Sequence, residues 1–397
     1  MKRTINSGGK LLISLHSIMM AVIVVHIILT VSFDNTGLSS LPLASLAIYL
    51  CLGMGILYAL ITRLIVVNWS YIAFILFTFV LYLSSLYSPT SQYIKDIYLT
   101  RFAYSFAIYF IVCITIKSKK DINTLLVSVI VSGVILSLLV YSKYGLANLL
   151  IMGERLDFGD INMLATYCSF SIVAAFAYFM SHKKSKFWTV LAMLICIPMV
   201  MFTGSRKSIL LIAIGVVVFL FLFGEHKRLL RNIFIGATAI GLLIWLINTI
   251  PAFSNIREHF DDMYQLFAGG DNLDKGDLNR LKFIDEGLRM FVANPIFGNG
   301  FASSYYYLGT YTHCNFVELL MNNGIIGFGI YYYIRIRILY EGFKQTNRTD
   351  MLTVLCIVFS LMLLFTDVGV VSFYNRFLMI ILAICVKTID IKGEVIE

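Results

Sequence analysis

Charged residues are scarce in this sequence. Asp, Glu, Lys and Arg make up 13% of the 397 residues, whereas hydrophobic residues make up 59%. Soluble domains carry about 25% charged residues, so the composition excludes a soluble globular protein. It equally excludes a disordered or collagen-like chain. The mean hydropathy of +0.86 instead indicates a bundle of membrane helices, each of which needs about 20 apolar residues.

Several motifs that carry enzyme chemistry are missing. The sequence has no Walker loop, no GxGxxG, no HExxH and no serine nucleophile elbow, so neither an ATP-driven machine nor a zinc protease is supported. The seven cysteines form no CxxC pair, and no His, Cys and carboxylate cluster has metal-ligand spacing. We therefore expect no metal and no cofactor.

Long apolar runs dominate what is present. Twelve runs are long enough to span a membrane, at about 11–33, 40–60, 69–87, 98–116, 124–141, 161–180, 187–203, 207–223, 231–250, 315–334, 352–366 and 369–386. The sequence therefore predicts an all-α polytopic membrane protein with about twelve transmembrane helices.

The positive charges between the runs predict the orientation of the chain. Most of the 31 Lys and Arg residues fall in every second connection, as at 117–120 and 183–186. Cytoplasmic loops are enriched in Lys and Arg. Both termini are therefore predicted to be cytoplasmic, and nucleic-acid binding is not expected from the net charge of +9.

One long polar segment interrupts the apolar runs. Leu278, Leu281, Ile284 and Leu288 recur within it at helical spacing, which predicts an amphipathic helix. We expect three parts: transmembrane helices one to nine over 1–250, a large, partly helical periplasmic (outer-face) loop over 251–314, and three further transmembrane helices with a cytoplasmic tail over 315–397.

The first candidate site residues are Arg206 and Lys207, after a short Gly204-Ser205 connection. This position predicts that Arg206 begins a helix at the membrane boundary. A cation there opposes the positive end of the helix dipole, so an anion should compensate it. Either the arginine extends toward lipid phosphates, or it binds a substrate phosphate together with the exposed helix N–H groups.

Three more arginines are candidates on the outer face. Arg280 borders the apolar side of the loop helix, and Arg289 is on the same helix. Arg155 lies in a charged loop ahead of the sixth run. Each could contact substrate, and each could equally be a solvated surface residue.

His313 is the candidate proton acceptor. It lies where the long loop re-enters the membrane, and histidine is the usual residue for taking a proton near neutral pH. A structural role at the boundary is the alternative. Glu318, inside the tenth run, is costly there and often functional. It could orient His313, or pair with an arginine such as Arg376.

Together these residues resemble the superfamily of O-antigen polymerases and O-antigen ligases, which are bacterial envelope glycosyltransferases. Three segments carry the resemblance: Thr203-Gly204-Ser205-Arg206, then Asn294-Pro295-Ile296-Phe297-Gly298-Asn299-Gly300-Phe301, then His313-x-Asn315-x-x-Glu318-Leu319 with Asn323-Gly324-Ile325-Ile326-Gly327. The sequence departs from the family's adjacent His-Asn pair, because Cys314 separates the two residues.

The resemblance implies a metal-independent transfer of a glycan from undecaprenyl pyrophosphate. Arg206 and Arg280 match the family's paired arginines, and His313 matches its histidine. Guanidinium groups would stabilise the charge on the leaving pyrophosphate, and His313 would act on the attacking hydroxyl. Substrate-binding roles are expected for Arg155, Lys207, Asn315, Glu318 and Arg289, and stacking on sugars for Tyr305 and Tyr311.

Polymerisation of lipid-linked oligosaccharide repeat units, as in lipopolysaccharide biosynthesis, is the favoured activity. It would take place on the outer leaflet of the inner membrane, among membrane lipids, with a chain-length regulator as a possible partner. One alternative is a ligase that transfers the glycan to lipid A–core. A flippase is the alternative of another class, although paired halves and ionisable residues at mid-membrane, typical of transporters, are not evident.

Overall fold

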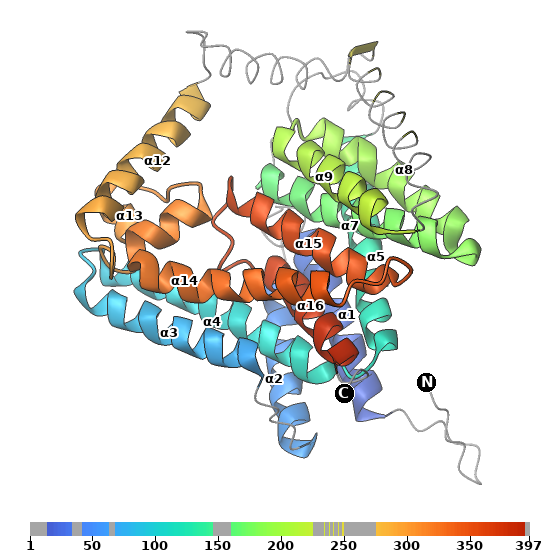
Figure 1. Ribbon diagram of the computed structural model, residues 1–397, viewed down its shortest axis with the longest axis horizontal. Coiled ribbons are helices and arrows are strands. Elements are labelled where there is room, and N and C mark those ends of the chain that lie inside the picture. The colour runs from blue at the N-terminus through green and yellow to red at the C-terminus, as the bar shows by residue number, and fades with distance from the viewer. Residues whose placement is uncertain are drawn as a thin grey trace.

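Every element in the described part of the chain is a helix. The computed structural model describes residues 14–33, 42–62, 68–145, 160–224 and 275–393, with isolated positions between 234 and 249. Figure 1 shows the helices α1 (Leu15–Phe33), α2 (Leu43–Thr62), α3 (Trp69–Tyr87), α4 (Gln92–Thr115), α5 (Lys119–Tyr144), α7 (Ile161–Ser181), α8 (Lys186–Phe202), α9 (Arg206–Leu222), α12 (Lys275–Ala293), α13 (Ser303–Tyr307), α14 (Asn315–Lys344), α15 (Met351–Asp367) and α16 (Arg376–Gly393).

The helices confirm the predicted fold class of a polytopic membrane protein. Six of them, α1 to α5 and α7, are long and apolar enough to cross a membrane, and α8 and α15 are shorter apolar helices. Most of the ninth apolar run, 231–250, lies outside the described residues. The twelfth run differs from the prediction: its first residues form a connection, and the helix begins only at Arg376.

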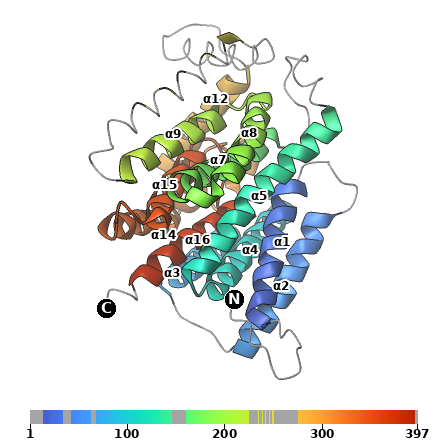
Figure 2. The same ribbon diagram turned by 90° about the vertical axis from the view of Figure 1, so that its right-hand side faces the viewer.

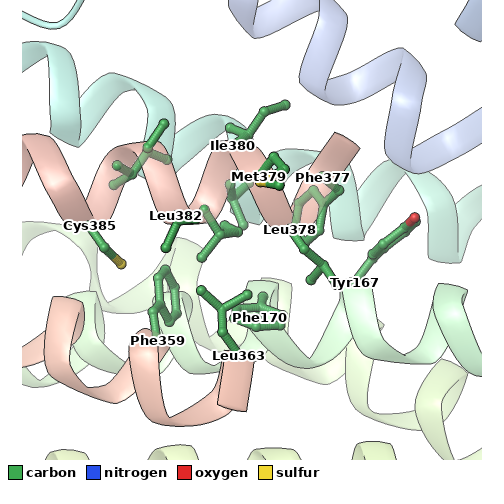
Figure 3. Close-up of a cluster of buried hydrophobic side chains, with 14 of the residues drawn as sticks. Tyr167, Phe170, Phe359, Leu363, Phe377, Leu378, Met379, Ile380, Leu382 and Cys385 are labelled. Atoms are coloured by element: carbon green, nitrogen blue, oxygen red, sulfur yellow. The ribbon is translucent and has the colours of Figure 1, made fainter. Parts of the chain in front are cut away.

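The centre of the bundle is built around α7, which is the most buried of the long helices. It packs against α5, α8, α9 and α15. Small residues permit close approach of membrane helices, and Gly215 of α9 faces Val173 of α7 so closely that a methyl group would lie 2.6 Å from it. Figure 3 shows Tyr167 and Phe170 of α7 meeting Phe359 and Phe377 of α15 and α16. This apolar core fixes one side of the bundle.

Helices α1 and α2 form the other side of the bundle. In Figure 2, α1 and α2 lie side by side, with α5 next to α1. A polar contact ties α1 to the start of α5, since the His16 imidazole lies 3.2 Å from the Asp121 carboxylate. Ser118, the N-cap of α5, accepts from the Asp121 N–H, as expected for a serine at this position.

The glycine-rich segment 294–301, called the glycine-rich clamp below, attaches the loop helix α12 to α14. Helix α14 breaks at Gly324, where φ is 61°. Gly298 has φ 73°, and a Cβ there would lie 2.5 Å from the Gly324 nitrogen. Backbone hydrogen bonds from Gly300 to Asn322 and from Ile325 to Pro295 join the two segments. Only glycine accepts such contact at positive φ without strain. As a result α12 and α13 lie over one end of α14 (Figure 1).

Candidate active site

A cavity of about 480 Å³ opens where the ends of several helices meet, a volume within the usual range for ligand sites. Its walls come from the first turns of α2, the first half of α4, the start of α7, Arg280 of α12, the loop before α14 and the connection from α15 to α16. Residues far apart in the sequence therefore share one site. Of the predicted site residues, Arg280, Tyr311 and His313 line it.

His313 is held in an unusual backbone conformation. Its φ is 58°, a left-handed value that is uncommon outside glycine and that is frequently found at functional sites. Its ring contacts two aromatic rings, with centroids 4.1 Å from Tyr311 and 6.2 Å from Phe283 of α12. The loop and the loop helix thus fix the imidazole together.

The surroundings of His313 favour its neutral form. Burial lowers the pKa of His313 below its usual value, and the nearby Arg280 guanidinium lowers this pKa further, whereas the Asp160 carboxylate raises it in part. A neutral imidazole at neutral pH can accept a proton. These three side chains line the same cavity.

Glu318 holds the loop that carries His313. Its buried carboxylate accepts hydrogen bonds from Ser304 Oγ at 2.6 Å, from the Thr312 backbone N–H at 2.8 Å and from Asn322 Nδ2 at 2.8 Å. The hydrogen bond to Thr312 holds the backbone at the residue directly before His313. Sequence reasoning offered an Arg376 pair or direct orientation of His313; the carboxylate instead contacts the backbone and neutral side chains.

Asn315 organises the connection between α15 and α16. Its Oδ1 accepts from the backbone N–H groups of Ser372 and Phe373, at 3.0 and 3.4 Å, and its Nδ2 donates to Tyr332 Oη at 2.9 Å. Tyr332 in turn donates to Asp367. Asn315 is fully buried and is not among the cavity-lining residues. These bonds explain why α16 starts later than its apolar run.

The two arginines of the loop helix differ in their placement. Arg280 lines the cavity. Arg289 is 76% exposed and lies 2.8 Å from Asp285 on the same helix; it is not part of the lining. The glycine-rich clamp sets the position of α12, and so the predicted motif contributes by placing Arg280.

Arg206 and Lys207 begin α9, as the sequence predicts. Gly204, with φ 64°, makes the turn from α8, and Ser205 is the N-cap. The Lys207 amine is buried without a hydrogen-bond partner, and its charge interacts with those of Asp160 and Arg280. The Lys207 Cδ atom would lie 3.2 Å from a Cβ added at Gly369, a residue of the cavity wall. Arg206 is adjacent but does not line the cavity.

Aromatic rings form one side of the cavity. Tyr311, Tyr98 and Tyr374 line it, and the Tyr305 ring contacts those of Tyr98 and Tyr311. Tyr305 stacks on Tyr98 with centroids 4.9 Å apart, and their hydroxyl groups are hydrogen-bonded. Of the two predicted tyrosines, Tyr311 therefore lines the cavity, whereas Tyr305 packs against Tyr98, which lines it.

Sequence reasoning assigned no substrate-binding role to several lining residues. Arg101 on α4, Arg376 at the start of α16, and Asp160 and Asn162 at the start of α7 all reach the cavity. Arg101 and Arg376 fall inside predicted spans, where a charge is itself a sign of function. Arg155 lies outside the described residues. Across the described segments, no group of three His, Cys, Asp or Glu residues could hold a metal ion.

A comparison with protein families finds one match. The family described as O-antigen ligase matches residues 191–332, a segment that runs from α8 into α14 and includes Arg206, Lys207, Arg280 and His313. This match confirms the resemblance to the O-antigen polymerase and ligase superfamily, and it agrees with an enzyme of the membrane. No curated protein matches the chain.

Proposed function

We propose that this protein polymerises lipid-linked oligosaccharide repeat units of an O-antigen or related surface polysaccharide. The donor is a glycan on undecaprenyl pyrophosphate, and the acceptor is a sugar hydroxyl of a second lipid-linked unit. The observation that carries this proposal is the placement of His313 and Arg280 in one cavity beside an aromatic wall.

In the proposed reaction, the acceptor hydroxyl attacks the anomeric carbon of the donor. A new C–O bond forms as the bond from that carbon to the pyrophosphate oxygen breaks. The hydroxyl proton goes to neutral His313, and the electron pair leaves with the pyrophosphate. General-base assistance of this kind contributes about 10²–10⁴-fold.

Arg280 stabilises the growing charge on the leaving pyrophosphate. Arg206, Lys207 and the positive end of the α9 helix dipole supply further positive potential near it. The buried Lys207 amine supports this role, because a cation without a hydrogen-bond partner is costly to bury unless an anion compensates it.

The aromatic wall provides surfaces for sugar rings. Tyr311, Tyr98 and Tyr374 line the cavity, and tyrosine rings combine a flat apolar face with a polar edge. The proposed site lies at the outer end of the bundle, with both termini cytoplasmic. The starts of α2, α4, α7 and α16 all reach this cavity. In the predicted orientation these four helix starts are all on the outer face, so their meeting in one cavity supports that orientation.

Ligation to lipid A–core is the second candidate, because the matched family is described as O-antigen ligase. The test is reconstitution of the purified protein in liposomes with a synthetic undecaprenyl-pyrophosphate repeat unit. Polymerisation predicts a ladder of products without another acceptor. A single product that forms only when lipid A–core is added would support a ligase, and transport without any new glycosidic bond would support a flippase.

A further inference from the structure

Two further arginines, Arg101 and Arg376, line the cavity besides Arg280, and the part that they line is here called its second end. Arg101 comes from α4 and Arg376 from the start of α16, and these two helices pack along each other. Ser105 Oγ donates to the Tyr374 carbonyl at 2.6 Å, which ties α4 to the backbone two residues before Arg376. The two arginines are therefore held by one local structure.

A tyrosine pair anchors this second end. The Arg101 guanidinium lies 5.2 Å from the centroid of the Tyr98 ring, close enough for a cation–π contact. The Tyr98 ring in turn lies 5.1 Å from that of Tyr374. In the described part of the chain, Arg101 forms no ion pair with a carboxylate.

A row of rings connects the second end to His313. The centroid distances are 4.1 Å from His313 to Tyr311, 6.4 Å from Tyr311 to Tyr305, and 4.9 Å from Tyr305 to Tyr98. Sugar rings bound against the two tyrosines of this row that line the cavity, Tyr311 and Tyr98, would extend from the proton acceptor to Arg101.

Among the described lining residues, arginines outnumber carboxylates. The described lining contains Arg101, Arg280 and Arg376 but only one carboxylate, Asp160. That carboxylate acts at the first end, where it influences the pKa of His313 and of Tyr311. Arg101 and Arg376 thus add two cationic groups to the described lining besides Arg280.

We infer that Arg101 and Arg376 form a binding site for an anionic group on the acceptor substrate. Guanidinium groups bind phosphate and carboxylate through paired hydrogen bonds. The anion is either the pyrophosphate of a lipid-linked acceptor or the carboxylate of an acidic sugar in it. This inference rests on the proposed function, since it needs a second glycan beside the donor.

The second end lies outside the segment that the family shares. Residues 191–332 include Arg280 and His313, whereas Arg101 and Arg376 fall before and after this segment. The shared segment therefore supplies the reacting groups, and the rest of this chain supplies the acceptor site.

The test is a calorimetric titration of the full-length protein in nanodiscs with farnesyl pyrophosphate, after subtraction of empty nanodiscs. A second titration uses a disaccharide that contains glucuronic acid. The variants are Arg101→Gln, the double variant Arg101→Gln/Arg376→Gln, and Arg280→Gln. Arg337→Gln is the matched control, because Arg337 packs over Trp69 and does not line the cavity.

If the acceptor anion is a pyrophosphate, the wild-type protein binds two farnesyl pyrophosphates. The double variant then retains one site and Arg280→Gln retains the other, each loss being about 10- to 100-fold in affinity. If the anion is a sugar carboxylate, the acidic disaccharide binds, and the double variant weakens its binding by a similar factor.

The inference is overturned if the double variant, while its melting temperature matches the wild type, leaves both titrations unchanged. Arg101→Gln alone guards against misfolding, because Arg101 is exposed and its loss should still weaken the second site. Neither titration needs turnover, so an inactive preparation would contradict the proposed function without affecting this result.

Discussion

At the residue scale, the candidate residues fall into two groups with different roles. His313 and Arg280 face the cavity, whereas Glu318 and Asn315 hold the backbone around it. The sequence offered His313 and Arg280 as candidates, and the resemblance to the O-antigen polymerase and ligase superfamily singled them out. Without the resemblance, the pattern could not separate Arg280 from Arg289, since only the packing of α12 decides which one faces inward.

The pH dependence of activity should follow the charges around His313. Asp160 raises the pKa of His313, so Asp160→Asn should lower it further and keep the imidazole neutral to a lower pH. The acid limb of the rate profile should then move to lower pH. Asparagine is as good an N-cap as aspartate, so α7 should keep its start.

Arg280→Gln gives the opposite expectation. Loss of this guanidinium removes an influence that lowers the pKa of His313, so the acid limb of the residual activity should move to higher pH. The test is to measure the rate as a function of pH for both variants in the same liposome assay. Shifts in the same direction would contradict the assigned charges.

Glu318→Gln should reduce activity through the loop. The amide cannot accept all three hydrogen bonds that the carboxylate accepts, which should cost about 1–3 kcal/mol of unfolding free energy. A misplacement of His313 by about 1 Å could lower the rate up to about 100-fold. The rate is measured well below the melting temperature, and an unchanged rate with reduced stability would make Glu318 purely structural.

At the element scale, the helices were largely predictable and their junctions were not. Apolar runs gave the positions of α3 and α7 to within a few residues, because hydropathy alone determines what can span a membrane. The late start of α16 depends on the hydrogen bonds from Ser372 and Phe373 to Asn315, a long-range contact that no local pattern encodes. The break of α14 at Gly324 likewise depends on the glycine-rich clamp.

Gly324→Ala should damage the clamp. The new methyl group would collide with the Ile296 carbonyl. In addition, the φ of 61° at this position is unfavourable for alanine. We expect a loss of about 1–3 kcal/mol, together with loss of activity as α12 detaches. Gly329→Ala on the same helix is the matched control, since its Cβ would meet nothing within 4 Å. Equal melting temperatures for the two variants would contradict the clamp.

At the scale of the whole molecule, the site is assembled from the ends of helices spread over the chain. Arg101 and Arg376 are separated by most of the sequence and meet in one cavity. Their proximity could not be predicted, because it depends on the packing of α4 against α16. The sequence could predict only the outer face on which such residues would gather.

The predicted orientation can be tested with introduced cysteines. All seven native cysteines are buried, so the background labelling should be low. Lys282→Cys on α12 should react with an impermeant maleimide added to intact cells. Lys184→Cys, in a basic connection, should react only after the cells are opened. The reverse pattern would place the cavity on the cytoplasmic side.

The central claim is that His313 accepts the proton of the attacking hydroxyl. The most direct measurement is the rate of polymer formation by His313→Ala in liposomes that contain the synthetic lipid-linked repeat unit. The account predicts a rate about 10²–10⁴-fold lower, with protein abundance unchanged and a stability change within about 1 kcal/mol. A folded variant that forms the polymer ladder at the wild-type rate would contradict the account.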